Sequence, residues 1–573
     1  MRVSNLLWSA LLFVTAALVL PPFLFLVAGS LSGAAPGEPG TLSLKTYLEA
    51  YASSRTYRVL WNSFLIAFAK TCVAMIWGVT VAWLVTRTDL PFRRLLEVLI
   101  PIPFFIPGLF SVLGWIHLAN PNNGLINQFA QALLGLETAP FNIYSYSGII
   151  FIMTLGSTSF IYLLTVGAFR GLDPALEESA RTCGAGMLLT FFRVSLPLIT
   201  PALLGAFILS FIRGLEAFEA PLLLGSPVNI YVFTNEIHRA ITFRDPPQFG
   251  LAAALGVTII VITFVLVFAQ WRILGDRQFV TITGRGYSPH PFKLRGWRWP
   301  AFFFCLLNFL LDGIFPIAML VASSLSSIPG IYGWELITLK HYMTAFSDRI
   351  VLRALYNTTL LAILAALVGI VLSAFIAYVT TRTRFWGRRL IEILSWLPWT
   401  MPGIVLGVGM LWTVLITPGY SALYGTLWVL LVAFVIKGLP LGVQALTGSL
   451  VQVHRELEES ARTHGASWGQ SCRYILFPLI RPGISAAGIF FAYTVVRDLS
   501  SAVLLYGYGS EVLTVAILRY WTEGRQPVVS VLALTTLVLL VLLSALDRVL
   551  SARRRESPAL VPERELRPVP TGD

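Results

Sequence analysis

The sequence predicts an all-α, polytopic membrane protein with twelve transmembrane helices arranged as two parallel six-helix repeats. The composition is 56% hydrophobic and only 12% charged, whereas soluble domains are about 25% charged. Many apolar runs are long enough for a helix to cross a bilayer, which takes about 20 residues. The second half of the chain also repeats the first. Because the apolar runs are continuous, they do not fit the alternating pattern of a transmembrane β-barrel.

Twelve apolar runs define the predicted spans. Those of the first half lie near residues 6–28, 60–85, 95–117, 146–168, 201–224 and 249–271. Those of the second half lie near residues 300–323, 356–380, 391–415, 424–446, 482–505 and 527–547. The run at 6–28 is too long for a signal peptide and no small-residue cleavage pattern follows it, so it is expected to be a retained anchor.

The runs divide the chain into four parts. We expect a first repeat at 1–271 with its core from about 58, and a second repeat at 300–547 with its core from about 353. A polar, basic segment rich in Gly and Pro at 272–299 is the predicted linker, and its arginines could also meet anionic lipid headgroups. Residues 548–573 form a polar tail.

The basic residues predict the orientation. If the N-terminus is cytoplasmic, 27 of the 41 Lys and Arg residues lie on the cytoplasmic side, 10 lie outside and four fall within spans. Cytoplasmic loops collect Lys and Arg, so both termini are predicted to be cytoplasmic. Topology therefore explains the net charge of +13, and no nucleic-acid partner is inferred.

One polar stretch occurs twice. "LEESARTCGAGMLLTFFRVSLPL", residues 176–198 (the first cassette), recurs as "LEESARTHGASWGQSCRYILFPL", residues 457–479 (the second cassette), at an offset of 281. Around the second and third spans the offset is 295, as between Arg87 and Arg382. Each repeat has an even number of spans, so the two halves have the same orientation, related by an axis along the membrane normal.

Each cassette predicts a helix, a sharp bend and a second helix at the cytoplasmic face. Asp173 can cap the first helix and Pro174 suits its first position. Gly184 permits a left-handed stop, and the second helix can run until Pro197. The second cassette has the same plan, with Ser467 as a cap. The alternative is an amphipathic loop that only rests on lipid.

The cassettes resemble the "EAA" loop of ABC importer permeases, the inner-membrane components of binding-protein-dependent transport systems. The matching residues are Glu178, Ala180, Gly184 and Pro197 in the first copy, and Glu459, Ala461, Gly465 and Pro478 in the second. Ser179 and Ser460 replace the first alanine, and Phe477 stands where leucine is usual.

This resemblance implies a MetI-like permease fold in the bacterial cytoplasmic (inner) membrane. It further implies that the cassettes dock as coupling helices on two copies of a separate ABC ATP-binding subunit, and that an extracytoplasmic binding protein delivers substrate. ATP and magnesium would be held by the partner, with no cofactor and no catalytic residue in this chain. Independently, the chain contains no G-x-x-x-x-G-K-[ST] phosphate-binding loop, so ATP hydrolysis would need a partner.

The fused, twelve-span form resembles iron(III)-type permeases, and more distantly those for thiamine and 2-aminoethylphosphonate. Iron(III) is therefore the expected substrate, with thiamine, 2-aminoethylphosphonate or a polyamine as alternatives in the same class. An ion-gradient-driven secondary transporter is the alternative from another class. It predicts acids buried in the middle of the membrane, whereas here Glu216, Glu219 and Asp498 lie towards the outer ends of their spans.

Charged residues within spans are costly and often functional. The candidate pathway residues are Glu216 and Glu219 of the fifth span, Lys437 of the tenth, and Arg497 and Asp498 of the eleventh. Glu216 aligns with Arg497 at offset 281, so the two are hypothesised to face each other and to form a gate pair or touch the substrate. In the alternative, Arg213 pairs with Glu216 along its own helix. Lys437 either lines the pathway or pairs with a neighbouring acid, and no metal site is predicted.

Overall fold

The computed structural model describes residues 2–32, 34–38, 40–274 and 291–553. Most of the predicted linker and the end of the predicted tail lie outside these residues. Among these described residues, eight helices are long and apolar enough to cross a membrane, and there are up to twelve if each of four bent helix pairs counts as one span. The twelve-span, all-α prediction is therefore confirmed, while the predicted domain boundaries stay predictions.

The six spans of the first half are α1 (Arg2–Ser32), α3 (Ser54–Arg87), the broken span α4 (Arg93–Leu99), α5 (Ile102–Phe105) and α6 (Gly108–Ala119), then α8 (Tyr146–Gly171), α12 (Thr200–Leu215) and α14 (Phe249–Leu274). Short helices connect them: α2 (Lys45–Ala52), α7 (Leu125–Leu134), η2 (Pro221–Gly225), η3 (Ser226–Val228) and α13 (Phe233–Thr242). The first cassette contains α9 (Pro174–Thr182), α10 (Met187–Thr190), η1 (Phe191–Ser195) and α11 (Leu196–Leu198).

The second half follows the same order. After η4 (Arg295–Trp297), its spans are α15 (Arg298–Phe309) with η5 (Leu310–Ile314) and α16 (Phe315–Leu325), α18 (Arg349–Arg382), the broken span α19 (Arg388–Trp396), η7 (Leu397–Thr400) and α20 (Gly403–Ile416), then α21 (Leu427–Val451), α25 (Arg481–Arg497) and α28 (Gln526–Arg553). The connectors are η6 (Trp334–Leu336), α17 (Lys340–Ser347), η8 (Ser421–Leu423), α26 (Ala502–Leu505) and α27 (Leu513–Thr522). The second cassette contains α22 (Arg455–Thr463), α23 (Trp468–Ser471), η9 (Cys472–Leu476) and α24 (Phe477–Leu479).

The third span of each half is bent, although the sequence predicts one continuous helix there. The helices on either side of the break are inclined by 94° in the first half and 113° in the second. The breaks fall at Pro107 and Pro402, and the residue before each proline is extended. Proline lacks the amide hydrogen that would continue a helix and pushes its predecessor into extended geometry.

The first helix of each half packs against the other half. Helix α1 lies against α19 and α20, while α16 lies against α6. Aromatic contacts extend this exchange, with the ring centroid of Trp8 5.9 Å from that of Tyr378 and the ring of Phe292 6.2 Å from that of Trp83. Buried clusters containing residues of both halves result, so the duplicated chain folds as one interlocked body.

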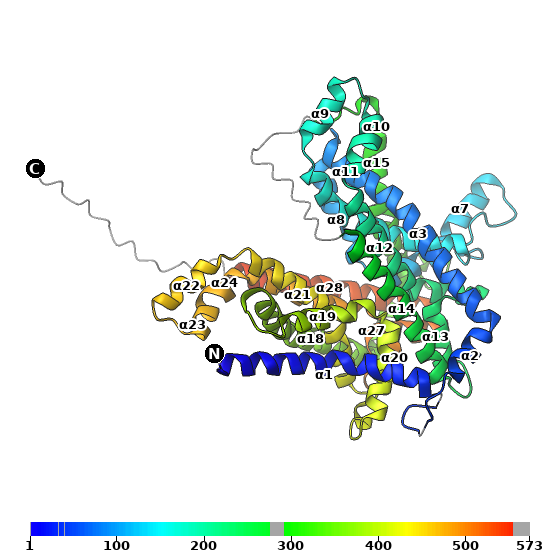
Figure 1. The fold of residues 1–573 in the computed structure, drawn as a ribbon. Coiled ribbons are helices and arrows are strands. Elements are labelled where there is room, and N and C mark those ends of the chain that lie inside the picture. Colours follow the sequence, from blue (N-terminus) through cyan, green and yellow to red (C-terminus); the bar gives the residue numbers. More distant parts are fainter. Residues whose placement is uncertain (1, 33, 39, 275–290, 554–573) are drawn as a thin grey trace, which may run out of the picture.

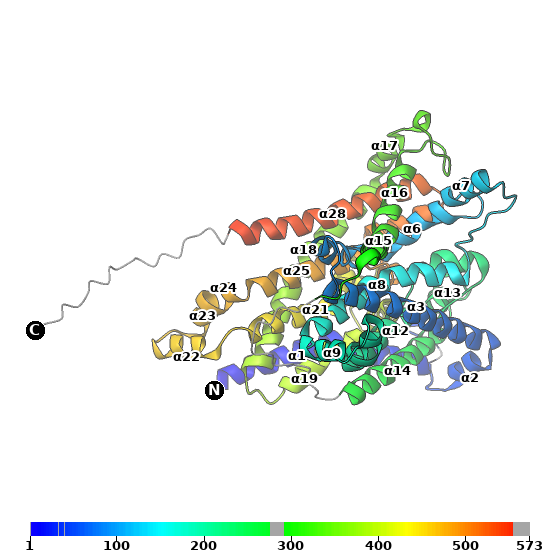
Figure 2. The ribbon, with the colours of Figure 1, turned by 90° about the horizontal axis from the view of Figure 1, so that it is seen from above.

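The two cassettes lie far from each other, each at the tip of its own half. In Figure 1, α9 to α11 are at the top and α22 to α24 at the left, and the two halves diverge towards them. Figure 2, turned by 90°, also separates the cassettes. At the opposite end the halves approach, and α13 of the first half contacts α20 of the second. This V-shaped arrangement opens towards the cassettes.

Candidate functional site

Both cassettes have the predicted helix, bend and helix. Asp173 caps α9 by accepting a hydrogen bond of 2.9 Å from the backbone N–H of Ala175. Ser467 caps α23 within a capping box. Gly184 and Gly465 share a φ of +84°, a left-handed conformation that residues with a Cβ avoid. The two glycines, visible in the sequence, make the bends alike, whereas the caps differ, since neither Asp173 nor Ser467 has a capping side chain at the equivalent place in the other cassette.

None of the cassette residues singled out from the sequence is fully buried. Glu459, Gly184, Gly465 and Pro197 are exposed, and Glu178, Ala180, Ala461 and Pro478 are partly buried. The acid that precedes each predicted glutamate points the other way, since Glu177 and Glu458 are buried. Adjacent residues of a helix point about 100° apart, so one acid of each pair faces the fold.

Glu177 is held by a buried arginine. The Arg87 Nη1 lies 3.6 Å from the Glu177 Oε2, and the two side chains are 4% and 7% exposed. Arg87 Nη2 also donates to the carbonyl oxygens of Phe169 and Leu172 at the end of α8, at 2.5 and 2.7 Å. Glu177 Oε1 accepts a hydrogen bond of 2.6 Å from the hydroxyl of Ser195, which lies in the second helical arm of the first cassette. One ion pair therefore joins α3, α8 and both arms of the cassette.

The second half repeats this buried ion pair. Arg382 Nε lies 3.4 Å from Glu458 Oε1, with side chains 7% and 9% exposed. Arg382 Nη2 donates to the carbonyl oxygens of Leu450, at 2.7 Å, and Val453. Tyr378 replaces the serine link: its hydroxyl donates to Glu458 Oε2 at 3.4 Å and accepts from Trp468 Nε1 at 2.9 Å.

Neither ion pair was predicted from the sequence, although the sequence contains a signal for both. Arg87 aligns with Arg382 at offset 295, and Glu177 aligns with Glu458 at offset 281. We call the pairs Arg87–Glu177 and Arg382–Glu458 the two Arg–Glu clamps.

A cavity of about 310 Å³ lies between the halves. All five predicted pathway residues, Glu216, Glu219, Lys437, Arg497 and Asp498, line it. Three further charged residues line it as well, Lys70, Arg213 and Asp312. Each half contributes two cations and two acids, so residues far apart in sequence meet in one charged cavity.

Lys437 both lines the cavity and pairs with an acid. Its Nζ lies 2.6 Å from the Asp498 Oδ1, which also accepts from the Ser500 hydroxyl at 2.8 Å. Gly403, at the start of α20, leaves the room for this pair, because a Cβ there would overlap the Lys437 Nζ and the Ser500 Oγ.

The structure contains neither of the two hypothesised contact pairs. Within the described part of the chain, no ion pair of 4.0 Å or less joins Glu216 to Arg497 or to Arg213. The Arg213 guanidinium instead lies 4.6 Å from the ring centroid of Phe160. Arg497 Nη1 donates to the Tyr493 hydroxyl at 2.5 Å. Likewise, among the described residues no group of three or more His, Cys, Asp or Glu side chains could hold a metal ion.

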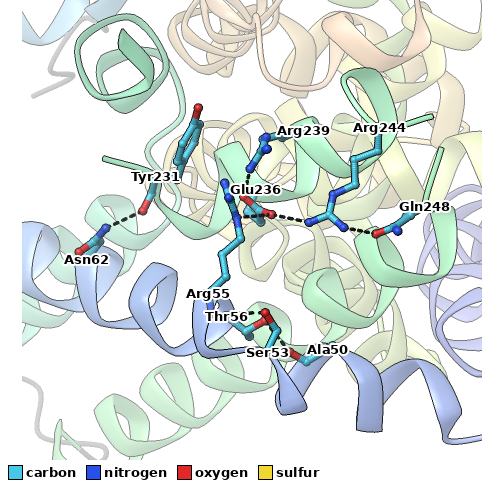
Figure 3. A network of polar contacts seen from close by, with 10 residues as sticks. All are labelled: Ala50, Ser53, Arg55, Thr56, Asn62, Tyr231, Glu236, Arg239, Arg244 and Gln248. Carbon is cyan, nitrogen blue, oxygen red and sulfur yellow. Dashed lines mark hydrogen bonds and ion pairs between the residues drawn. The ribbon is translucent and has the colours of Figure 1, made fainter. Parts of the chain in front are cut away.

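A second polar network fixes the end of the first half that lies away from the cassettes (Figure 3). Glu236 of α13 accepts from Arg55 at 2.9 Å and from Arg244 at 3.2 Å, and Arg239 lies 3.7 Å from it. Arg55 and Arg239 also lie over the Tyr231 ring. These contacts tie α13 to the start of α3.

The fold and the repeated cassettes define a class of protein, an α-helical membrane permease built by duplication. The family model of the binding-protein-dependent transport system inner membrane component matches residues 74–275 and 369–556. The chain belongs to this family. It is therefore a multi-pass inner-membrane protein and the permease, or transport subunit, of an ABC importer.

Curated relatives agree with this assignment. The chain is 25% identical over 485 residues to the ferric transport system permease protein FbpB of Actinobacillus pleuropneumoniae, covering 82% of this chain and 68% of the relative. It is 25% identical to a probable ABC transporter permease of Sinorhizobium fredii, covering 83% and 84%. The sulfate transport system permease protein CysT of Salmonella typhimurium is 28% identical but matches only 45% of this chain.

Proposed function

We propose that this chain forms the translocation pathway of an ATP-driven importer and couples to ATP hydrolysis through its two cassettes. The observation that carries the proposal is that the chain builds the same cassette twice, in the same local conformation, each held to the core by an Arg–Glu clamp. Two equivalent docking elements suit two copies of one ATP-binding subunit, which would hold ATP and magnesium.

The clamps give the proposed coupling a physical path. A force on α9 or α22 passes through a buried ion pair to the end of α3 or α18, and these helices run the length of their halves. Closing the partner dimer would bring the two cassettes together. Because the halves diverge towards the cassettes (Figure 1), that movement would close the V and shift access to the cavity between them.

The orientation follows from the same proposal. The cassettes and both termini would be cytoplasmic, as the distribution of basic residues predicts, and the opposite end would receive substrate from an extracytoplasmic binding protein.

We propose iron(III) as the imported substrate. The relative named as a ferric permease aligns with both halves of this chain, whereas the sulfate relative aligns with less than half. Uptake of radioactive iron(III) by cells with and without the gene tests this choice. Unchanged iron uptake together with reduced uptake of thiamine, 2-aminoethylphosphonate or a polyamine would replace iron by that substrate.

Crosslinking tests the coupling. A single cysteine at position 183 or 464, both exposed, is placed in an otherwise cysteine-free chain expressed in its host and crosslinked in intact membranes. We expect an ATP-binding subunit to be captured, and capture to be lost on Glu178→Lys or Glu459→Lys. Lipid adducts alone at both positions would refute the docking role, and transport that continues without any ATP-binding subunit would favour a secondary transporter.

A further inference from the structure

The charges of the cavity between the halves do not satisfy one another. Buried charges in proteins are normally paired, because an unpaired charge loses its hydration without compensation. Within the described part of the chain, Lys70, Arg213 and Arg497 have no carboxylate oxygen within 4.0 Å, although four acids share the same cavity. Only Lys437 has such a partner.

The unpaired cations are held by neutral groups. Lys70 Nζ donates to the Ser157 hydroxyl at 3.0 Å and to the carbonyl oxygen of Ser210 at 2.5 Å. Arg213 lies over aromatic rings, and Arg497 donates to Tyr493. These contacts fix the position of each cation without neutralising its charge.

Two of these cations come from opposite halves and face the same space. Arg213 is at the end of α12 and Arg497 at the end of α25, and their charges repel each other. An oxyanion between two guanidinium groups converts that repulsion into two attractive interactions, and the planar guanidinium matches carboxylate and phosphate oxygens. The arrangement therefore favours an anionic group at the boundary between the halves.

Two acids of the cavity also have no cation in contact with them. Glu216 and Glu219 form no ion pair of 4.0 Å or less with another described residue, and Glu216 Oε1 is buried without a hydrogen-bond partner. Glu216 nevertheless lies in the field of Arg213, Lys70 and Lys437. The cavity thus contains both cations and acids that have no oppositely charged group in contact with them.

We propose that this cavity binds a substrate that carries at least one oxyanion group, a carboxylate or a phosphate, between Arg213 and Arg497, with Lys70 adding positive charge and the cationic part of the substrate facing Glu216 and Glu219. Its volume of about 310 Å³ lies at the lower end of the range of small-molecule sites. The inference rests on the proposed import function and deepens it. Iron(III) would cross the membrane as a complex with an oxyanion ligand, not as a bare cation.

Equilibrium dialysis of the purified full-length chain in lipid nanodiscs tests this inference, with no ATP-binding subunit and no binding protein present. The probes are citrate, inorganic phosphate, iron(III) citrate and spermidine, a cation without an oxyanion. We expect one or more of the three oxyanion probes to bind and spermidine not to bind. The comparison of citrate with its iron complex shows whether the oxyanion is recognised free or metal-bound. Binding of spermidine, with or without the oxyanion probes, or binding of none of the probes, would overturn the proposal.

Variants locate the bound oxyanion. Arg213→Gln is expected to weaken binding at least tenfold and Arg497→Lys, which keeps the charge, to weaken it less. Arg525→Gln is the matched control, because Arg525 is exposed, pairs with Glu523 and lies outside the cavity. Wild-type affinity in a folded Arg213→Gln protein would refute the site.

A second variant keeps the proposal testable if Arg213→Gln does not fold. Glu216→Gln removes a negative charge beside the cations, so it is expected to strengthen binding of free citrate and to weaken binding of the iron complex. A merely structural role would shift both probes in the same direction, and that result would contradict the proposal.

The binding assay and the crosslinking assay can fail separately. Cassettes that do not dock leave citrate binding in nanodiscs unaffected. Conversely, a captured ATP-binding subunit together with no oxyanion binding would retain the importer and remove the oxyanion site.

Discussion

The Arg–Glu clamp of the second half allows a sharp test of how the cassettes are held. Glu458 is buried against Arg382, while its neighbour Glu459 is exposed on the same helix, α22. Glu458→Gln removes the charge and keeps the shape, and Glu459→Gln makes the same chemical change one residue away. The two variants therefore separate the effect of losing the buried ion pair from the effect of the Glu-to-Gln change itself.

The contacts of Arg382 set the expected magnitude. Removing one partner of a buried ion pair costs about 3–5 kcal/mol when the other charge is left alone. Here the guanidinium keeps two carbonyl acceptors, on Leu450 and Val453, so the loss is closer to that of one charged hydrogen bond. We expect about 2 kcal/mol, or roughly a 30-fold change in the local opening equilibrium of α22.

Hydrogen exchange measured by mass spectrometry in nanodiscs checks this number. Amides of α22 are expected to exchange roughly 30-fold faster in Glu458→Gln and at the wild-type rate in Glu459→Gln. The crosslink to the partner should show the opposite dependence, with Glu459→Gln weakening capture directly. Equal exchange in the two variants would refute the clamp, because it would mean that the buried pair does not hold the helix.

Other substitutions test single features of the fold. Gly465→Ala is expected to destabilise the second cassette by about 1 kcal/mol, because the backbone of Gly465 is left-handed. Gly469→Ala is the control and should be neutral or stabilising, because Gly469 is helical and a Cβ there would meet no other atom. Hydrogen exchange of residues 455–479 distinguishes the two variants, and equal effects would contradict the argument. Gly403→Ala should lower the thermal unfolding temperature, since the added Cβ would overlap Lys437. Gly108→Ala, at the equivalent position of the first half, should leave that temperature unchanged, because its Cβ would point into open space. An unchanged unfolding temperature in Gly403→Ala would mean that the ion pair of Lys437 moves freely. Lys437→Met should lower the same temperature by leaving an acid unpaired, and neutralising that acid as well should restore part of the loss.

Much of the architecture was predictable because the lipid bilayer imposes a simple rule. Backbone polar groups must be satisfied within the membrane, so apolar runs of sufficient length gave the number of spans. The cassette geometry was predictable because its determinants are local, a cap at Asp173 and a glycine at the bend. The bends at Pro107 and Pro402 were also encoded locally, but they lie inside apolar runs whose length alone suggested one helix.

Tertiary relations were harder to predict. Nothing in α1 itself indicates that it packs on the other half, since an apolar helix surface fits many partners. Lys70 and Asp312 sit in spans where their neighbours in sequence are apolar, and only the folded chain brings them into one cavity. Which of two adjacent acids, Glu177 or Glu178, faces the fold depends on the rotation of α9, which composition does not determine.

Comparison of the two halves separates what duplication has kept from what it has changed. The Arg–Glu clamps and the left-handed glycines are the same in both halves. In the cavity the equivalent positions differ: Glu216 corresponds to Arg497, and Lys437 corresponds to a glycine. If the cassettes dock as proposed, they meet two identical partners and must stay alike, whereas the cavity meets a single substrate, so its two halves need not be alike. Clamp substitutions in either half should then cause similar defects, while exchanging the charges of Glu216 and Arg497 should not restore the wild-type cavity, because each charge has different neighbours in its own half.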